Sequence, residues 1–92
     1  MRTIERTNSF KRDYKREKKS GQYKDLDKKL IAILTALAND EPLPISNRDH
    51  PLSGNWEDFR DCHVRPDLVL IYQKVEGVLR LARLGSHSEL FG

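Results

Sequence analysis

Three histidines and two aspartates in the C-terminal half of the chain are the side chains best suited to chemistry. Histidine exchanges protons near neutral pH, because its ordinary pKa is about 6.5. Cleavage of RNA without a metal needs a base for the ribose 2′-OH, an acid for the departing 5′ oxygen, and cations that hold the phosphoryl charge. The candidates for proton transfer are His50, Asp61, His63, Asp67 and His87, and the candidate phosphate-binding cations are Arg60 and Arg83.

The roles of the two aspartates stay open at this stage, because Asp61 or Asp67 could act as the base or could orient a histidine. A metal site is a second possibility, since Asp61-x-His63 could bind a transition metal together with further ligands from the same set. The chain has neither a pair of cysteines nor an HExxH motif, so we expect no metal cofactor. A third possibility is that these polar groups line the rim of a protein interface.

Strands are expected to position these side chains, because function concentrates at strand ends and loops that a rigid sheet holds in place. The alternating segment Trp56–His63 predicts a strand with Asp61 and His63 on one face. By the same alternation Trp56 and Phe59 point to opposite faces, so that at most one of them can stack on a base.

Two further strands and a short terminal segment follow. The apolar run within Asp67–Tyr72 predicts a central strand. The short turn before this strand is expected to bring Asp67 back beside His63. Glu76-Gly77 predicts a tight turn into the next strand, Val78–Leu84. The last segment, Ser86–Phe91, is expected to form either a turn of helix or an extended tail.

The N-terminal half predicts one strand and two helices. Residues 2–7 suit an edge strand, and Asn8 or Ser9 can cap a helix that runs to Ser20-Gly21. Apolar residues at helical spacing then predict a second helix, which ends near Asn39 before a proline-rich segment. The order of elements indicates an α+β fold, in which an N-terminal strand and two helices pack on an antiparallel sheet. The apolar stripe consists of Leu26, Leu30, Ile33, Leu34 and Leu37.

The 92 residues are the length of a single domain, which we take to be 1–92. The net charge of +3 is unevenly distributed, because residues 1–30 hold eleven Lys and Arg against five Asp and Glu. A basic helix can bind a polyanion or an acidic protein, or its charged face can simply be solvated. We expect four lysines of the first helix to contact RNA, namely Lys11, Lys15, Lys18 and Lys19.

The single cysteine, Cys62, excludes an intramolecular disulfide, which fits a reducing compartment. Alternation places Cys62 on the face opposite Asp61, and we expect its thiol to be packed rather than nucleophilic. The chain lacks an N-terminal apolar run and any stretch long enough to span a bilayer. We therefore expect a cytoplasmic protein with no membrane partner.

Three stretches together resemble the YafQ toxins, a branch of the RelE/ParE superfamily of toxin–antitoxin systems. The first is Asp49–Gly54 followed by Trp56. The second is Phe59–Val64, which runs through Pro66-Asp67 into Leu70-Ile71-Tyr72. The third is Arg80–Phe91. The resemblance covers essentially the whole chain, although the N-terminal helices match only in being basic and leucine-rich.

The resemblance implies a RelE-like fold and a ribosome-dependent mRNA endonuclease that cuts mRNA in the ribosomal A site. It also implies a cognate DinJ-like antitoxin, with operator DNA bound only by the toxin–antitoxin complex. Position by position, His50, His63, Asp67 and His87 match the family's catalytic set, with Asp61 close by. His87 is then the expected proton donor, and Phe91 matches an aromatic that contacts RNA or holds the C-terminal tail.

Two other functions remain as alternatives. A ParE-like gyrase poison would have the same fold and a protein target, but it would not need the His/Asp set. A non-catalytic module that binds RNA or protein is the third hypothesis. Mapping of mRNA 5′ ends after induction separates a nuclease from both.

Overall fold

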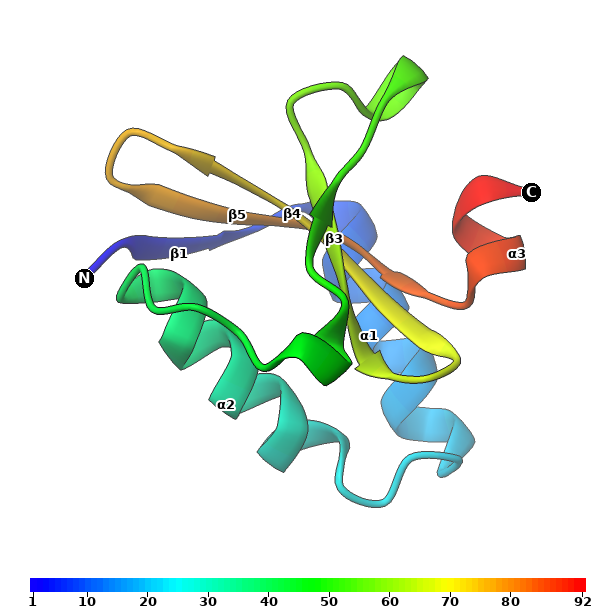
Figure 1. Cartoon of the computed structure of the whole chain (residues 1–92). Helices are drawn as coiled ribbons and strands as arrows, with labels where there is room; N and C mark the ends of the chain where they lie inside the picture. Colours follow the sequence, from blue (N-terminus) through cyan, green and yellow to red (C-terminus); the bar gives the residue numbers. More distant parts are fainter.

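Three helices and five strands make up the fold, which the computed structural model describes for residues 1–92 (Figure 1). The strands lie in the order β1-β5-β4-β3-β2; β1 runs parallel to β5, and the other neighbours are antiparallel. The predicted α+β class is confirmed. The elements are β1 (Thr3–Arg6), α1 (Asn8–Ser20), α2 (Leu26–Ala38), β2 (His50–Pro51), β3 (Arg60–Arg65), β4 (Leu68–Val75), β5 (Val78–Gly85) and α3 (His87–Phe91).

The N-cap of α1 is Thr7, not the predicted Asn8 or Ser9. Its Oγ1 accepts a hydrogen bond from the backbone N–H of Phe10 at 3.0 Å, which satisfies one of the free amides of the first turn. The helix ends at Gly21, as predicted, because its φ of 68° lies in the left-handed region that glycine adopts at little cost.

The helices α1 and α2 cover one face of the sheet and enclose the larger of two core clusters. Four residues of the predicted α2 stripe are buried there, and the fifth, Leu34, is half-buried against the same cluster. Cys62 is fully buried in this core, which confirms that it is packed, and burial raises the pKa of its thiol. The strands contribute Val64, Leu68, Leu70, Tyr72, Leu79, Leu81 and Leu84.

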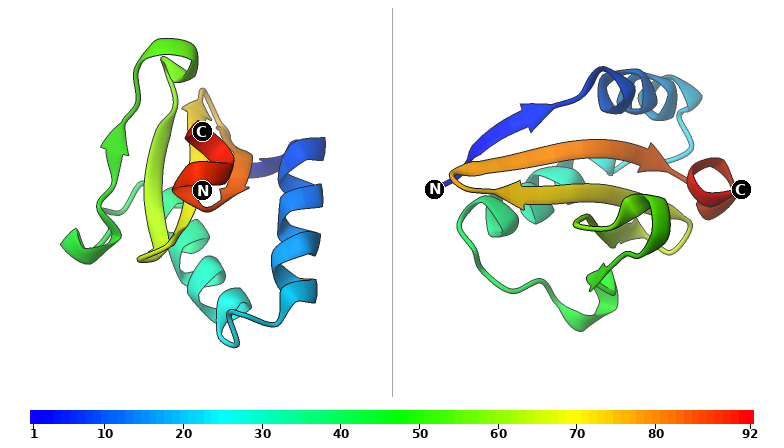
Figure 2. Two further views of the ribbon diagram at one scale, coloured as in Figure 1. Left: turned by 90° about the vertical axis from the view of Figure 1, so that its right-hand side faces the viewer. Right: turned by 90° about the horizontal axis from the view of Figure 1, so that it is seen from above.

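The opposite face of the sheet carries a smaller core beneath α3 and the segment that precedes β3. Its buried members are Val69, Ile71, Ala82 and Leu90, of which the last belongs to α3. In Figure 2, α3 stands beyond the end of β5, at the opposite end of the sheet from the N-terminus. The candidate histidines lie on this face of the sheet, the one that carries the smaller core.

The strand predicted over Trp56–His63 is wrong in its first half. Gly54–Trp56 forms a 3-10 turn, Asp58 has a left-handed φ of 74°, and β3 begins only at Arg60. Trp56 and Phe59 consequently do not point to opposite faces. They pack edge to face, with ring centroids 5.2 Å apart, at the margin of the smaller core.

No helix of the structure has both the length and the apolar character that crossing a membrane requires.

Candidate active site

A short antiparallel pairing brings the first histidine to a buried acid. β2 consists only of His50 and Pro51, and its register with β3 sets His50 opposite Asp61. The Nδ1 atom of His50 lies 3.0 Å from Oδ1 of Asp61 and 2.7 Å from the carbonyl oxygen of Arg48. Because a carbonyl oxygen can only accept, Nδ1 carries a proton, and in the neutral ring Nε2 is the basic nitrogen.

Asp61 is fully buried, and it lies below residues that are open to solvent. The proton on His50 Nδ1 is directed to Arg48, and neither carboxylate oxygen of Asp61 accepts a well-formed hydrogen bond. Burial raises the pKa of Asp61, while the nearby imidazoles of His50, His63 and His87 oppose that rise. A buried carboxyl group without hydrogen bonds is costly for a fold and is therefore a typical feature of a functional site.

The other two histidines form a row with an aromatic ring. His63 lies two residues after Asp61 on β3 and shares its face, as predicted. Its ring centroid is 5.5 Å from that of His87, which in turn is 5.3 Å from that of Phe91. The Nδ1 atom of His63 lies 3.3 Å from the carbonyl oxygen of Pro66, so this ring also presents Nε2 as its basic nitrogen.

The helix α3 supplies His87 and Phe91, which lie one turn apart on it. Ser86 and Glu89 form a capping box, in which each side chain accepts a hydrogen bond from the backbone N–H of the other residue. Leu90 anchors α3 in the smaller core. Of the two conformations expected for the segment Ser86–Phe91, a turn of helix and an extended tail, the structure shows the helix.

Asp67 does not join the histidines in this structure. It is exposed in the turn before β4, and no hydrogen bond or ion pair connects it to His63 or His87. Its carboxylate faces Tyr23 instead. Burial, followed by this carboxylate, raises the pKa of Tyr23 to about 12. The turn brings the carbonyl of Pro66 to His63, not the carboxylate that the sequence suggested.

The two candidate phosphate-binding cations lie in different surroundings. Arg60 precedes Asp61 on β3 and therefore points to the other face, where its Nε atom pairs with Asp49 at 3.2 Å. Arg83 lies opposite Ile71 of the smaller core, beside a bulge in which Ala82 is the extra residue. Register therefore places Arg83 on the same side of the sheet as Asp61, but its Nε atom pairs with Asp13 of α1 at 2.6 Å.

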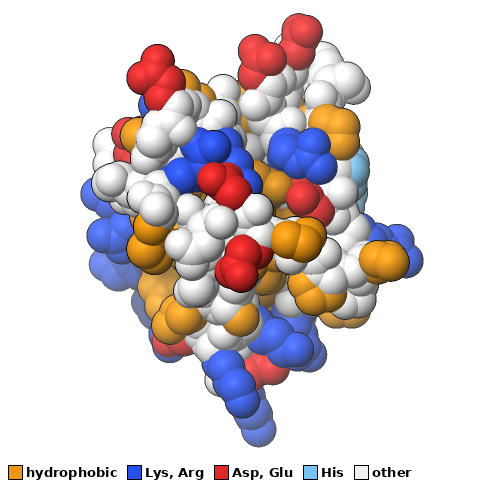
Figure 3. Space-filling view, turned by 60° about the vertical axis from the view of Figure 1, so that its left-hand side comes forward, with side chains coloured by type: hydrophobic (Ala, Val, Ile, Leu, Met, Phe, Trp, Pro, Cys, Tyr) orange, Lys and Arg blue, Asp and Glu red, His pale blue; other side chains and the backbone are white.

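The lysines predicted to contact RNA are exposed on α1, and one of them is neutralised. Lys18 pairs with Asp27 at 2.6 Å, whereas Lys11, Lys15 and Lys19 have no ion-pair partner. On the face of the molecule drawn in Figure 3, Lys and Arg side chains include a group at the lower end, while acidic side chains project at the top. Three of the four predicted lysines therefore carry a positive charge that no ion pair within the protein neutralises.

Two further observations bear on ligands. No group of three or more His, Cys, Asp or Glu is arranged to hold a metal ion. A groove of about 690 Å³ lies between α2 and the end of β3 and touches the histidine cluster only at His63. His50 and His87 are exposed and His63 is half-buried, so the histidine cluster is open to solvent.

Sequence reasoning missed Asp13, Arg16 and Glu89, which connect α1, β5 and α3 through polar contacts. The Ser86-x-x-Glu89 spacing is a capping-box signal that could have identified α3 as a helix. No sequence signal pointed to Asp13 or Arg16, because charged residues are common on both sides of α1 and only the tertiary fold selects these two.

Comparisons with known proteins agree with this geometry. The mRNA interferase toxin YafQ of Escherichia coli strain K12 is 40% identical over 92 residues, which are 100% of this chain and 98% of that protein. The E. coli DinJ–YafQ complex contains a chain with a TM-score of 0.86 and 40% identity, with 100% of both chains covered. A copper-bound mutant toxin from Helicobacter pylori has a TM-score of 0.90 and 37% identity, with 99% of this chain and 100% of that chain covered.

A family match extends over nearly the whole sequence. Residues 2–92 fit the family described as the bacterial toxin of type II toxin–antitoxin systems, YafQ. The predicted resemblance is confirmed by this match and by the identity to the E. coli protein. The chain therefore belongs to the YafQ family of bacterial toxins.

Proposed function

We propose that this toxin is an mRNA interferase, an endoribonuclease that cleaves mRNA in the ribosomal A site and so stops translation in the cytoplasm. The observation that carries the proposal is the group of three solvent-accessible histidines around the buried Asp61. The name of the E. coli relative supports the substrate class. The gyrase poison is disfavoured, because a protein target gives no reason to keep a buried acid beneath three imidazoles.

The reaction we propose needs only proton transfers and charge stabilisation. A basic imidazole Nε2 of His50 or His63 removes the proton of the ribose 2′-OH, and the 2′ oxygen attacks the adjacent phosphorus. The bond to the 5′ oxygen breaks, and His87 donates the proton that this oxygen gains. The products are a 2′,3′-cyclic phosphate and a 5′-hydroxyl end, so atoms and protons balance.

Other residues support this reaction in distinct ways. Arg83 is the arginine on the same side of the sheet as Asp61, and it would bind the phosphoryl oxygens with the guanidinium atoms that its pair with Asp13 leaves free. Phe91 extends the row of rings and offers a surface on which a base can stack. Asp67 is included in the proposed catalytic set only because the sequence resembles the family at this position, and its carboxylate would have to turn from Tyr23 to reach the RNA.

Partners follow from the same family. We propose that a DinJ-like antitoxin neutralises the toxin and that the complex, rather than the free toxin, binds operator DNA. A solved DinJ–YafQ complex from E. coli supports the partner class. The free lysines of α1 are proposed to contact ribosomal RNA, where neutralised phosphates strengthen binding.

A copper-bound relative raises a metal-dependent mechanism as a second candidate. The proposal here is metal-independent. Cleavage by purified toxin on intact, magnesium-containing ribosomes should be unchanged by a chelator selective for transition metals. Strong inhibition that is reversed only by adding a transition metal would favour the second candidate instead.

The decisive experiment is induction of the toxin in bacterial cells, with mapping of mRNA 5′ ends. We expect cuts in phase with codons and growth arrest, both absent in His87→Ala. Thr35→Ala is the matched control, because Thr35 is exposed on α2 away from the site. Equal growth arrest by wild type and His87→Ala, without codon-phased cuts, would refute the nuclease proposal.

A further inference from the structure

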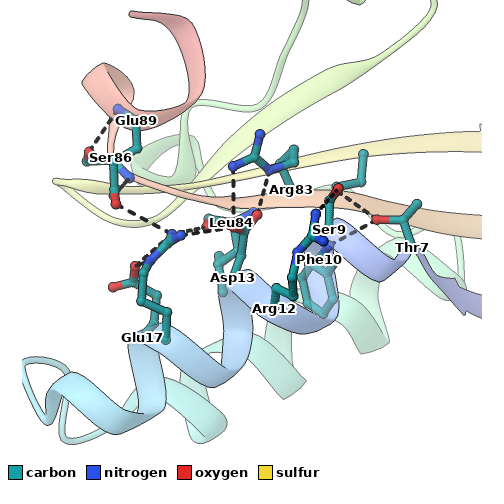
Figure 4. A network of polar contacts seen from close by, with 12 residues as sticks. Thr7, Ser9, Phe10, Arg12, Asp13, Glu17, Arg83, Leu84, Ser86 and Glu89 are labelled. Carbon is teal, nitrogen blue, oxygen red and sulfur yellow. Dashed lines mark hydrogen bonds and ion pairs between the residues drawn. The ribbon is translucent and has the colours of Figure 1, made fainter.

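We propose that Arg16 on α1 is a positioning residue that holds α3, and with it His87, in register with the rest of the site. This inference rests on the proposed function, in which His87 is the proton donor. It concerns a residue of the basic helix whose half-exposed guanidinium contacts β5 and α3. Its basis is a set of contacts between α1, the end of β5 and the start of α3 (Figure 4).

The first observation is that α1 replaces a missing strand along β5. β1 pairs with β5 only as far as Leu81, and beyond that point the backbone of β5 has no strand neighbour on that side. Side chains at the start of α1 and within it fill the gap. Thr7 Oγ1 donates to the carbonyl of Ala82 at 2.8 Å, and the N–H of Leu84 donates to Asp13 Oδ2 at 3.0 Å. These bonds fix α1 to β5 just before α3.

The second observation is the number of groups that Arg16 joins. Its guanidinium donates to the carbonyl of Leu84 at 3.1 Å and to Asp13 on its own helix at 3.1 Å. It also pairs with Glu17 at 3.1 Å and with Glu89 of α3 at 3.6 Å. One planar guanidinium therefore links three elements, which the compact ammonium of a lysine cannot do in the same geometry.

The third observation is that Glu89 is also part of the α3 cap. Its Oε1 accepts the N–H of Ser86 at 2.9 Å, while Ser86 Oγ accepts the N–H of Glu89 at 3.2 Å. Arg16 thus contacts the side chain that closes the first turn of α3, where His87 lies. Any displacement of Glu89 is transmitted directly to the backbone that carries this histidine.

The fourth observation is the close fit at the junction of β5 and α3. A Cβ atom on Gly85 would lie 3.2 Å from Arg16 Nη2, 3.3 Å from Glu89 Oε1 and 3.3 Å from Leu90 Cδ2. The guanidinium, the cap and the buried leucine therefore close around a residue that has no side chain. This fit restricts the direction in which the chain leaves the sheet.

The need for such a contact follows from the length of α3. A helix of five residues is not stable by its own hydrogen bonds, so its position depends on tertiary contacts. Leu90 holds its far end, and Arg16 holds its beginning through Glu89. A misplacement of a catalytic group by about 1 Å can cost a factor of about 10² in rate. The competing view is that Arg16 forms only surface ion pairs, which contribute little.

The test compares Arg16→Ala with Arg12→Ala, the arginine one turn earlier on the same helix. Arg12 contacts only Ser9 of its own helix, at 3.3 Å, and forms no hydrogen bond or ion pair with β5 or α3. Purified proteins are assayed on programmed ribosomes for kcat and KM. The imidazole signals of His87 and the amide exchange of residues 87–91 are measured by NMR on the free proteins.

We expect Arg16→Ala to lower kcat by about tenfold to a hundredfold, with little change in KM. It should also shift the His87 ring signals and accelerate amide exchange in α3, while Arg12→Ala leaves these NMR signals unchanged. Arg16→Lys should restore only part of the loss. Glu89→Gln, which keeps an acceptor for the cap, tests the same link if Arg16→Ala folds poorly, and should change the same signals less.

Unchanged His87 signals and full kcat in both Arg16→Ala and Glu89→Gln would overturn the proposal. A rise in KM alone would also overturn it, because Arg16 would then act by contacting ribosomal RNA. The two proposals fail separately. If the wild-type toxin does not cleave mRNA, the proposed function is wrong, while the NMR comparison still decides whether Arg16 holds His87 in place.

Discussion

Two buried aspartates show how differently one residue type can be used within a small fold. Burial alone would raise the pKa of Asp13, but hydrogen bonds from Arg83 and from the N–H of Leu84 outweigh it and lower that pKa. Asp61 has no such donors, so burial raises its pKa despite the surrounding histidines. Asp13 stabilises the fold as a carboxylate, whereas Asp61 costs stability when it is ionised.

We predict that Asp13→Asn destabilises the protein by about 2–3 kcal/mol at pH 7, because charge-assisted hydrogen bonds are lost. The folded pKa of Asp13 lies below its unfolded value. Its contribution is therefore present above the unfolded pKa and is lost as pH falls through the folded pKa. Urea unfolding at pH 7 and at pH 3 measures this. A difference between wild type and variant that stays constant over this range would contradict the assignment.

We predict the opposite sign for Asp61→Asn. The folded pKa of Asp61 lies above its unfolded value, so its ionisation destabilises the fold progressively as pH rises from the unfolded pKa to the folded pKa. The neutral amide removes this cost, and the variant should be more stable than wild type by about 1–3 kcal/mol at pH 7. At pH 4 the gain should be smaller. Cleavage should fall, because the charge beneath the histidines is gone. A variant less stable than wild type at pH 7 would show that the carboxylate is satisfied in solution.

At the scale of the element, α3 is the part of the fold most dependent on a few contacts. We predict that Leu90→Ala frees α3 locally, because Leu90 is its one buried side chain. Truncation of a buried leucine costs about 2–5 kcal/mol, and here the loss should appear mainly as faster amide exchange in residues 87–91 and as reduced cleavage. The control is Ile31→Ala, since Ile31 is 63% exposed on α2. Amide exchange in α3 that is as slow in Leu90→Ala as in wild type would contradict the prediction that Leu90 holds this helix.

The elements that the sequence predicted well are those with long, regular patterns. The α2 stripe and the apolar run of β4 bury whole faces, and nothing in the tertiary fold opposes either pattern. The start of β3 was predicted wrongly, because alternation over Trp56–Phe59 also fits a turn whose aromatic rings pack together. The two-residue strand β2 is too short for any periodicity to reveal it.

The candidate site was predictable in composition but not in geometry. Residue chemistry selected the histidines and Asp61, and strand alternation correctly placed His63 with Asp61. The contact between His50 and Asp61 depends on β2 pairing, which no local pattern encodes. The orientation of Asp67 toward Tyr23 and the contacts of Arg16 with β5 and α3 depend on how α1 lies against the sheet, which only tertiary packing determines.

At the scale of the whole molecule, charge is divided between two uses. Most cations on the sheet and beside it form ion pairs that join elements, such as Arg83 with Asp13 and Arg80 with Glu5. Cations without an ion-pair partner lie almost entirely within the first thirty residues and are exposed. They are Arg6, Lys11, Arg12, Lys15, Lys19, Lys24, Lys28, Lys29 and Arg48. The free positive charge therefore lies mainly on α1, α2 and the segment between them, which suits contact with a large polyanion.

This division predicts which lysines of α1 set the salt dependence of the proposed binding to ribosomes. Substitution of Lys11, Lys15 and Lys19 by Gln should weaken binding and reduce the slope of log K against log salt by about 2, since each phosphate contact contributes about 0.7–0.9. Lys18→Gln should change the slope much less, because Lys18 is already paired with Asp27 at 2.6 Å. Binding of labelled ribosomes across a salt series measures both, and the chemistry on bound ribosomes should be unaffected. An equal change of slope per lysine in the two variants would show that the Lys18–Asp27 pair opens on the ribosome. An unchanged slope in the triple variant would show that α1 does not face ribosomal RNA.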